Sequence, residues 1–197
     1  KNGLAHLDLQ ENKDFRRLHN RELEDEVVCL LGTGSISQAI ANRFKPFNVK
    51  LLGVNTSGHQ VEGFDACYAF DEMKHALALS DIVIMTLPLT ETTKYFFDDS
   101  YFEAMKQDSI FINVGRGRII DENALIKHLN SNHLAYAVLD VMETEPCPKE
   151  SKLWTTPHLL ITPHDSGVSE KTGVRLLKLF IENIDAYQKQ NPLHNCV

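Results

Sequence analysis

Short apolar runs alternate along the chain with segments whose apolar residues recur at helical spacing. The apolar runs are 27–32, 49–55, 66–70, 81–88, 109–115, 134–141 and 159–163, and their length and β-prone content predict buried strands. The helical segments are 35–45, 73–80, 100–105, 121–131 and 169–190. Strands that alternate with helices predict a parallel sheet covered on both faces. The expected fold is therefore a doubly wound α/β fold with three layers, α/β/α.

The two ends of the chain depart from this alternation. Residues 1–24 are rich in charge and carry leucines at mixed spacing, which predicts a polar helix and a connector. Residues 25–167 hold the alternating pattern and form the predicted domain. Residues 168–197 contain a long amphipathic helix, on which one face gathers Val174, Leu177, Phe180, Ile181 and Ile184.

Composition limits the class of protein. The chain has 197 residues, of which 43% are apolar and 24% charged, enough for the core of one ordinary domain. A formal net charge of −7 without a long basic run argues against nucleic acid or an anionic membrane as a partner. No apolar stretch approaches the length that spans a bilayer, and residues 1–20 have no signal-peptide core.

The cysteines and histidines indicate neither disulfides nor a metal site. Cys29, Cys67, Cys147 and Cys196 are far apart and form no CxxC pair. Cys29 and Cys67 lie in predicted strands, which indicates buried and inert thiols. This usage fits a reducing cytoplasm better than secretion. The nine histidines show no metal-ligand spacing, so we expect no metal.

A glycine-rich turn joins the first predicted strand to the first predicted helix. In GTGSIS (32–37), Gly32 would allow a tight turn, and Gly34 would let a pyrophosphate approach the backbone at the helix N-terminus. Ser37 replaces the third glycine of this fingerprint. Set in a βαβ unit of about thirty residues, the turn indicates a Rossmann dinucleotide site. The alternative is a turn that serves only the geometry of the chain.

The end of the second predicted strand bears on the choice of cofactor. An acidic residue there would hold the ribose hydroxyls of NAD, and this chain has Asn55 instead. Without the carboxylate a 2′-phosphate is not repelled, and Thr56, Ser57 and His59 could donate hydrogen bonds to it. No arginine or lysine stands nearby to pair with the phosphate. The balance favours NADP slightly, with NAD as the alternative.

Three polar residues follow strands in the second half of the chain. Arg116, Glu145 and His164 each stand where an apolar run ends. Ligands of open α/β sheets bind beyond the carboxyl ends of the strands, so we expect all three in one crevice. Arginine matches a carboxylate with a planar fork of donors, and histidine transfers protons near neutral pH. The trio predicts chemistry on a small 2-oxo acid. The alternatives are a solvated arginine, a surface acid and a structural histidine.

Several motifs in register resemble one family. GTGSIS (32–37), LPLTETT (87–93), NVGRGRIID (113–121), LDVMETEP (139–146) and ITPHDSG (161–167) stand in the order and spacing of the D-isomer-specific 2-hydroxyacid dehydrogenases. The resemblance covers roughly residues 25 to 197 and is to the nucleotide-binding domain. The family includes glyoxylate/hydroxypyruvate reductases, D-lactate dehydrogenases and phosphoglycerate dehydrogenases.

The resemblance implies roles for individual residues. Arg116 would bind the carboxylate and carbonyl oxygen of the substrate, and His164 would be the general acid/base. Glu145 would hold His164 by a hydrogen bond and keep it protonated for reduction. Asp140 would contact the nicotinamide carboxamide. The further cofactor contacts implied are Gly32, Gly34, Ser35, Ile36, Asn55, Thr56, Ser57, Pro88, Val114, Gly115, Arg116, His164 and Gly167.

The resemblance also implies what this chain lacks. Family enzymes have a substrate domain of about a hundred residues before this region, and their final helix returns to pack on it. Residues 1–24 would then be the connector from that domain, and 168–197 the returning helix. We expect the chain to bind cofactor, to catalyse poorly or not at all by itself, and to form a homodimer through the nucleotide-binding domain.

Two alternatives from other functional classes stay open. The C-terminal-binding transcriptional corepressors share this fold and the same three residues, so the chain could belong to a non-enzymatic NAD(H)-binding regulator. It could also act only as an isolated nucleotide-binding module. Turnover of the cofactor by the full-length protein would distinguish an enzyme from these two alternatives. The identity of the 2-hydroxy acid is not readable from this chain.

Overall fold

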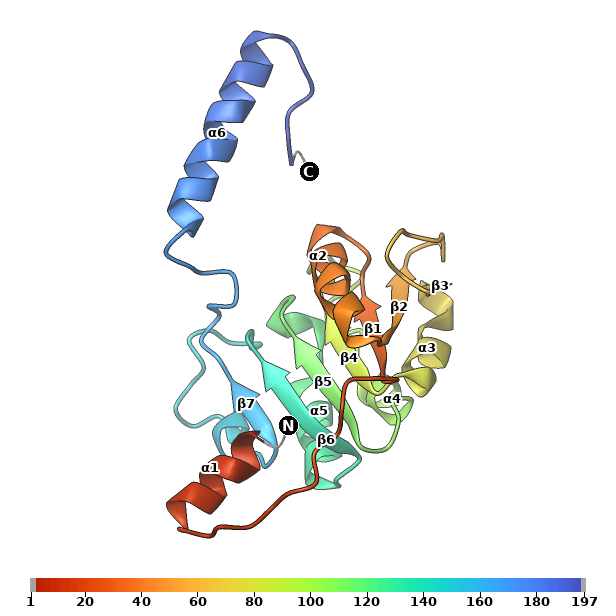
Figure 1. The fold of residues 1–197 in the computed structure, drawn as a ribbon, viewed down its shortest axis with the longest axis vertical. Helices are drawn as coiled ribbons and strands as arrows, with labels where there is room; N and C mark the ends of the chain where they lie inside the picture. Colours follow the sequence, from red (N-terminus) through yellow and green to blue (C-terminus); the bar gives the residue numbers. More distant parts are fainter. Residues whose placement is uncertain (1–2, 196–197) are drawn as a thin grey trace. The chain divides into compact units, whose positions relative to one another are not determined.

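The computed structural model describes residues 3–195 and confirms the predicted fold class. Within these residues seven parallel strands form one sheet in the order β3-β2-β1-β4-β5-β6-β7 (Figure 1). The strands are β1 (Val27–Leu31), β2 (Lys50–Asn55), β3 (Ala66–Ala69), β4 (Ile82–Met85), β5 (Ser109–Asn113), β6 (Leu134–Leu139) and β7 (Leu159–Ile161). The α-helices are α1 (Gly3–Glu11), α2 (Ser35–Phe44), α3 (Met73–Leu79), α4 (Asp99–Glu103), α5 (Glu122–Asn130) and α6 (Thr172–Gln188).

The chain divides into two compact units, residues 1–163 and residues 164–197. The first unit contains the whole sheet and the helices α1 to α5. The second unit contains α6, and the segment after this helix folds back on it through two hydrogen bonds between Asn183 and His194. Within this second unit an apolar face of α6 stays exposed, formed by Val174, Leu177, Phe180, Ile181 and Ile184.

The order of the strands reverses between β1 and β4. From β1 the chain builds outward through β2 to β3, and it then returns to add β4 on the other side of β1. Leu31 at the end of β1 pairs with Met85 at the end of β4, so the turns that follow both strands begin at the same edge of the sheet. Such a reversal is where open α/β sheets bind nucleotides. The sheet ends at its two edges in short strands, four residues in β3 and three in β7.

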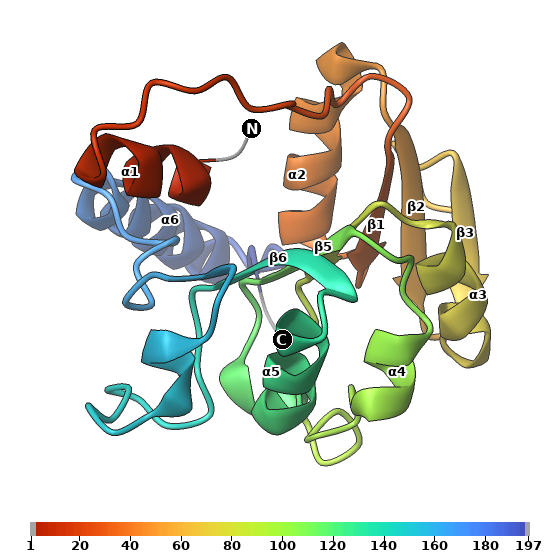
Figure 2. The same cartoon turned by 90° about the horizontal axis from the view of Figure 1, so that it is seen from below.

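Helices cover both faces of the sheet. Figure 2 shows α2 on one face and α3, α4 and α5 on the other. The α2 face holds the smaller buried cluster, in which Ala41 packs with Val28 and Leu30. The opposite face holds the larger cluster, built from side chains such as Phe102 and Leu125. Strands buried on both faces explain the nearly continuous apolar runs of the sequence.

The observed helix bounds differ from the predicted ones by up to three residues, and two of these differences have a clear local cause. The predicted helix 35–45 ends as α2 at Phe44, and a 3₁₀ turn continues over Lys45–Phe47. Pro46 lacks an N–H and its ring excludes a regular helical continuation. The predicted helix 169–190 begins only at Thr172, because the Thr172 hydroxyl accepts a hydrogen bond from the backbone N–H of Ser169 and closes a turn there.

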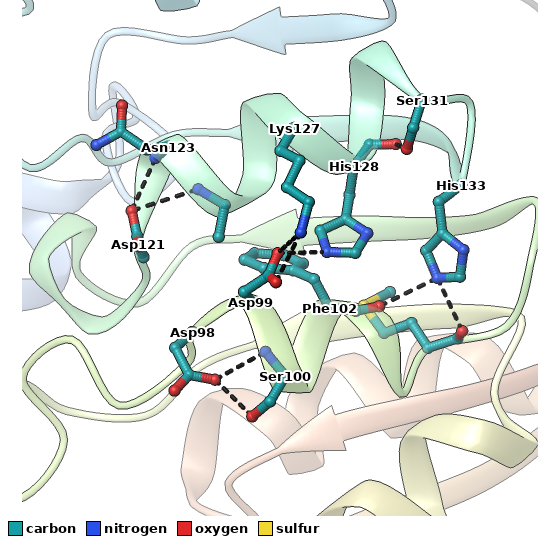
Figure 3. Close-up of polar contacts among 12 residues, drawn as sticks. Asp98, Asp99, Ser100, Phe102, Asp121, Asn123, Lys127, His128, Ser131 and His133 are labelled. Atoms are coloured by element: carbon teal, nitrogen blue, oxygen red, sulfur yellow. Dashed lines mark hydrogen bonds and ion pairs between the residues drawn. The ribbon is translucent and has the colours of Figure 1, made fainter.

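A polar cluster joins α4 to α5 (Figure 3). The Asp99 carboxylate lies between two side chains of α5, 2.7 Å from Lys127 Nζ and 2.9 Å from His128 Nε2. The pKa of Asp99 is lowered, chiefly by the hydrogen bond from Lys127 and then by that from His128. His133 Nε2 lies 3.2 Å from the carbonyl of Phe102 and so connects the end of α5 to α4. The cluster thus links α4 to α5 through side-chain hydrogen bonds.

Candidate functional site

A tight turn sits between β1 and α2, at the reversal of the strand order. Gly32 has a φ of +100°, which favours glycine, and a Cβ there would lie 3.0 Å from Thr86 Oγ1. A Cβ on Gly34 would meet nothing within 4 Å, so the space beside the first turn of α2 is open. Among the described residues, no side-chain hydrogen bond caps α2 at Gly34. A helix N-terminus with open space before it fits a pyrophosphate, and Ser35 and Ile36 begin that helix.

Ser37, the residue in the place of the third glycine, is buried and hydrogen-bonded. Its side chain is fully buried, and its Oγ lies 2.6 Å from Thr86 Oγ1. Thr86 Oγ1 donates to the carbonyl oxygen of Leu31, so the Ser37 hydroxyl is the donor to Thr86. This chain of hydrogen bonds fastens α2 to the ends of β4 and β1. In the usual fingerprint the third glycine allows the helix to pack closely on the strand. Here the hydrogen bonds of Ser37 hold α2 close to the strands instead.

Asn55 is engaged by the loop that follows β2. Its amide Nδ2 donates to the carbonyl of His59, and its Oδ1 accepts from the backbone N–H of Ser57. The Ser57 hydroxyl lies 3.0 Å from His59 Nδ1, while Thr56 is exposed. The Asn55 side chain therefore shapes the loop after β2, and this loop presents hydroxyl and imidazole groups. The contact of Asn55 with a ribose stays a prediction.

The turns after β4 and β5 approach each other closely. A Cβ on Gly115 would lie 2.8 Å from the carbonyl oxygen of Leu87, which leaves no room for a larger residue. Pro88 follows in the β4 turn, and its carbonyl accepts a hydrogen bond from the buried side chain of Thr93. Val114 is half-buried beside Gly115. Backbone and apolar groups thus line this part of the edge.

Arg116 stands in the turn directly after β5. The fully buried Asn113 side chain shapes this turn, because its Oδ1 accepts from Gly115 N and its Nδ2 donates to the carbonyl of Arg116. The Arg116 side chain is exposed, and its Nη1 donates to the carbonyl of Gly115 at 2.7 Å. The buried Asn113 amide fixes the backbone from which the exposed Arg116 side chain extends. A guanidinium is a group that can bind a carboxylate.

Glu145 lies six residues beyond β6, the neighbour of β5 in the sheet. Its side chain is exposed, and its Oε1 accepts a hydrogen bond of 3.0 Å from the backbone N–H of Met142. The peptide bond to Pro146 is cis. Asp140, immediately after β6, is buried and accepts a hydrogen bond from the Thr162 hydroxyl at 2.6 Å.

His164 and Gly167 begin the second unit of the chain. His164 comes three residues after the end of β7 and has a φ of +56°. A non-glycine residue in this left-handed region is uncommon, and such conformations gather at functional sites. A Cβ on Gly167 would meet nothing within 4 Å. The convergence of His164 with Arg116 and Glu145 stays a prediction.

Two groups near the Glu145 loop have shifted pKa values. Burial raises the pKa of the Glu122 carboxyl at the start of α5, the hydrogen bond from the Glu143 backbone N–H opposes this shift, and the negative charge of Glu143 adds to it. The pKa of Tyr95 is raised because its hydroxyl donates to the Glu143 carboxylate. Both groups lie close to the loop that carries Glu145.

Sequence reasoning missed the residues that support the site. Asn113, Thr86 and Thr162 all shape turns at the carboxyl edge through side-chain hydrogen bonds. Each stands at the end of a predicted apolar strand, and a polar residue at that position was the available signal. Cys196 lies outside the described residues.

The described chain gives no sign of a metal or a membrane span. Residues 3–195 contain no group of three or more His, Cys, Asp or Glu side chains arranged for a metal ion. In the same range, no helix combines the length and the apolar character needed to cross a bilayer.

Comparisons with known proteins identify a family that the chain matches over most of its length. The profile of the D-isomer specific 2-hydroxyacid dehydrogenase NAD binding domain matches residues 3–166. Glyoxylate/hydroxypyruvate reductase B of Citrobacter koseri is 35% identical over 181 residues, which cover 89% of this chain and 55% of that protein. The chain thus spans about half the length of the curated relatives it matches.

Two crystal structures show the same likeness. A probable 2-hydroxyacid dehydrogenase from Rhizobium etli, in complex with NADP, superposes with a TM-score of 0.90 at 28% identity and covers 99% of this chain and 62% of its own. A D-isomer specific 2-hydroxyacid dehydrogenase from Xanthobacter autotrophicus, in complex with NADPH, gives 0.89 at 30% identity and covers 100% of this chain and 80% of its own.

Proposed function

Because the chain belongs to the D-isomer specific 2-hydroxyacid dehydrogenase family, we propose that it is the cofactor-binding portion of an enzyme that reduces a small 2-oxo acid to a D-2-hydroxy acid, and catalyses the reverse reaction. The observation that carries the proposal is the Arg116 turn. Buried Asn113 fixes the backbone of this turn, and the exposed Arg116 guanidinium stands beyond the carboxyl end of β5. Arginine in this setting suits the carboxylate that every 2-oxo acid carries.

Each of the three polar residues has a distinct task in this reaction. Arg116 binds the substrate carboxylate and steadies the charge that develops on the carbonyl oxygen. His164 donates a proton to that oxygen during reduction and accepts it in the reverse direction, a contribution of about 10²–10⁴-fold. Glu145 holds the histidine in its working orientation. When bound, a nicotinamide cofactor supplies the hydride.

The residues of the first unit suit this cofactor. Gly32, Gly34, Ser35 and Ile36 would hold the pyrophosphate at the N-terminus of α2, where a Cβ on Gly34 would meet only open space. Val114, Gly115 and Pro88 would line the nicotinamide side, and Asp140 would complete the contacts from this unit. Gly167, in the second unit, stays a contact predicted from its family motif. These assignments rest on the family motifs and the local geometry.

Turnover by the full-length protein tests the proposal. NADPH and NADH are each mixed with glyoxylate, hydroxypyruvate or pyruvate, and the nicotinamide absorbance is followed. We expect consumption of the cofactor with at least one of these acids. Tight cofactor binding without turnover on any 2-oxo acid would overturn the enzyme and favour the corepressor-type regulator. The 197-residue chain alone should bind cofactor with little or no turnover.

NADP is the cofactor we propose, for a reason seen at the end of β2. Asn55 brings no negative charge to the ribose position, and Ser57 and His59 present polar groups there. Two structural neighbours were crystallised with NADP or NADPH. Titration by nicotinamide fluorescence should give a lower Kd for NADPH than for NADH. Asn55→Asp should reverse this order, with Asn132→Asp, in a distant turn, as the control.

A homodimer is the assembly we propose, through the nucleotide-binding domain. The support for this proposal is the family to which the chain belongs, which implies subunit contacts through this domain. Light scattering of the full-length protein should give the mass of a dimer. The mass of a monomer would overturn the homodimer.

The ends of the chain and its compartment complete the proposal. Residues 1–24 would connect to a substrate domain, 25–167 would be the nucleotide-binding domain, and 168–197 would return to the substrate domain. The exposed apolar face of α6 supports the last assignment. A cytoplasmic location fits the free thiols of Cys29, Cys67 and Cys147.

A further inference from the structure

We propose that Tyr95, Arg118 and Glu122 position Glu145 by holding Glu143, the residue two places before it. We call these three residues the Glu143 clamp. The inference rests on the proposed role of Glu145 in the reaction. It adds residues that would not touch the substrate and would act through the loop that carries Glu145.

Three polar groups of Glu143 each contact a different part of the fold. Its backbone N–H donates to Glu122 Oε1 at 2.6 Å, and its carbonyl oxygen accepts from Arg118 Nε at 3.2 Å. Its carboxylate Oε1 accepts from the Tyr95 hydroxyl at 2.5 Å. The clamp residues come from the turn after β4, the 3₁₀ turn after β5 and the first turn of α5. Glu143 is therefore fixed from three directions.

Tyr95 is itself held in an unusual conformation. Its φ is +53°, in the left-handed region that a bulky residue seldom adopts. Its backbone N–H donates to the carbonyl of Arg118 at 2.7 Å, so two members of the clamp are joined. Strained residues persist where their surroundings determine them and often serve a site. In this conformation the Tyr95 phenol donates its hydrogen bond to the Glu143 carboxylate.

The loop that carries Glu145 packs against another backbone segment on one side and borders a cavity on another. A Cβ on Gly117 would lie 1.9 Å from the carbonyl carbon of Met142, so the two backbones are in direct contact. A cavity of about 290 Å³ lies beside the loop, lined by Met142, Glu143, Thr144, Cys147, Pro148, Ser151 and Leu153, with Glu122 and Glu150 at its wall. Met142 packs in the hydrophobic core, but Thr144 and Glu145 are exposed, so polar contacts hold this outer part of the loop.

The clamp is connected to Glu145 by a short path. Met142, adjacent to Glu143, donates its backbone N–H to Glu145 Oε1 at 3.0 Å. This hydrogen bond links the backbone on one side of Glu143 to the Glu145 side chain. A shift of Glu143 would carry the Glu145 carboxylate with it, and a misplacement of about 1 Å at a catalytic group can cost about 100-fold in rate.

Hydrogen exchange tests the clamp without any need for turnover. Tyr95→Phe removes only the hydroxyl, and Tyr101→Phe is the matched control because Tyr101 stacks against Phe97 in the aromatic cluster beside α4. In full-length protein, Tyr95→Phe should speed exchange in a peptide covering 141–147 and leave α5 unchanged. Tyr101→Phe should leave 141–147 at the wild-type rate. Unchanged exchange at 141–147 in Tyr95→Phe would overturn the clamp.

Steady-state kinetics then tests whether the clamp positions Glu145. Tyr95→Phe should lower kcat by about 10-fold, less than full misplacement would cost, while the Kd for NADPH stays within about twofold of wild type. Faster exchange at 141–147 with unchanged kcat would overturn the positioning role. If the wild-type protein itself turns over no 2-oxo acid, the proposed function fails, while the exchange result still decides the clamp.

A pair of substitutions at Glu122 gives an independent check. Glu122→Gln keeps an oxygen that can accept the hydrogen bond from Glu143 N, whereas Glu122→Ala removes it. We expect Glu122→Gln to retain wild-type exchange and kcat, and Glu122→Ala to reproduce the effects of Tyr95→Phe. Equal effects of the two substitutions would show that charge, rather than the contact to Glu143, matters at this position, and would overturn the inference.

Discussion

The Ser37 hydroxyl donates to the Thr86 hydroxyl at 2.6 Å, and Thr86 donates in turn to the carbonyl of Leu31. The residue in place of the third fingerprint glycine thus joins α2 to the two central strands. Ser37→Ala should lower the free energy of unfolding by about 1 kcal/mol, the usual worth of one buried hydrogen bond. Urea denaturation measures this difference. Ser35→Ala, at the exposed first position of α2, should change stability by less than about 0.5 kcal/mol; an equal loss in both variants would contradict the role of Ser37.

Arg116→Lys should not behave as a conservative change. Lysine keeps the charge but loses the planar fork of donors that suits a carboxylate. We expect kcat/KM for the 2-oxo acid to fall by about 100-fold in full-length protein. The Kd for NADPH should rise much less than kcat/KM falls, since the fork of donors acts mainly on the substrate carboxylate. Arg43→Lys on the outer face of α2 should leave kcat/KM unchanged. A similar loss there would show that exchanging any exposed arginine for lysine lowers activity, and would contradict the specific role of Arg116.

Asp99→Asn should destabilise the protein in a pH-dependent way. The pKa of Asp99 is lowered by Lys127 first and by His128 second, so its ionised form is favoured in the folded state. The stability it contributes is present above the ordinary carboxyl pKa and is lost as pH falls through the lowered value. The difference in urea midpoint between wild type and Asp99→Asn should therefore be largest near pH 7 and shrink toward pH 3. Glu103→Gln on the same helix should show no such trend.

Cys29 should resist alkylation in the folded protein. Burial raises the pKa of its thiol to about 12, and the thiolate is the reactive form. With iodoacetamide at pH 8, peptide mass spectrometry should find Cys29 unmodified until denaturant is added. Half-buried Cys147 serves as the internal comparison and should be labelled in the native state. Labelling of Cys29 at the rate of Cys147 would contradict the burial.

The alternating pattern predicted the fold because buried apolar positions form short continuous runs in the strands and recur at helical spacing in the helices. Strands such as β2 and β5 were placed to within two residues, since both faces of a central strand are apolar. Helix α2 ended one residue earlier than predicted, where Pro46 acts. The order of the strands was not predicted. Right-handed βαβ connections restrict the possible orders, and the structure shows the order β3-β2-β1-β4-β5-β6-β7.

The supporting contacts of the site could not be read in the same way. The Tyr95–Glu143 hydrogen bond joins residues 48 positions apart, and no periodicity marks it. Asn55 was expected at the ribose, and its amide is engaged by His59 and Ser57 in its own loop. Motifs identify residues at strand ends, whereas their hydrogen bonds depend on which turns the fold brings together.

The short strands at the two edges of the sheet have a consequence for how the protein behaves at high concentration. An edge strand exposes unpaired N–H and C=O groups that can pair with a strand of another molecule. Only three residues of β7 and four of β3 present such groups within the described chain. The sheet therefore offers little template for intermolecular strand addition, and resistance to fibrous aggregation is built into its outermost strands.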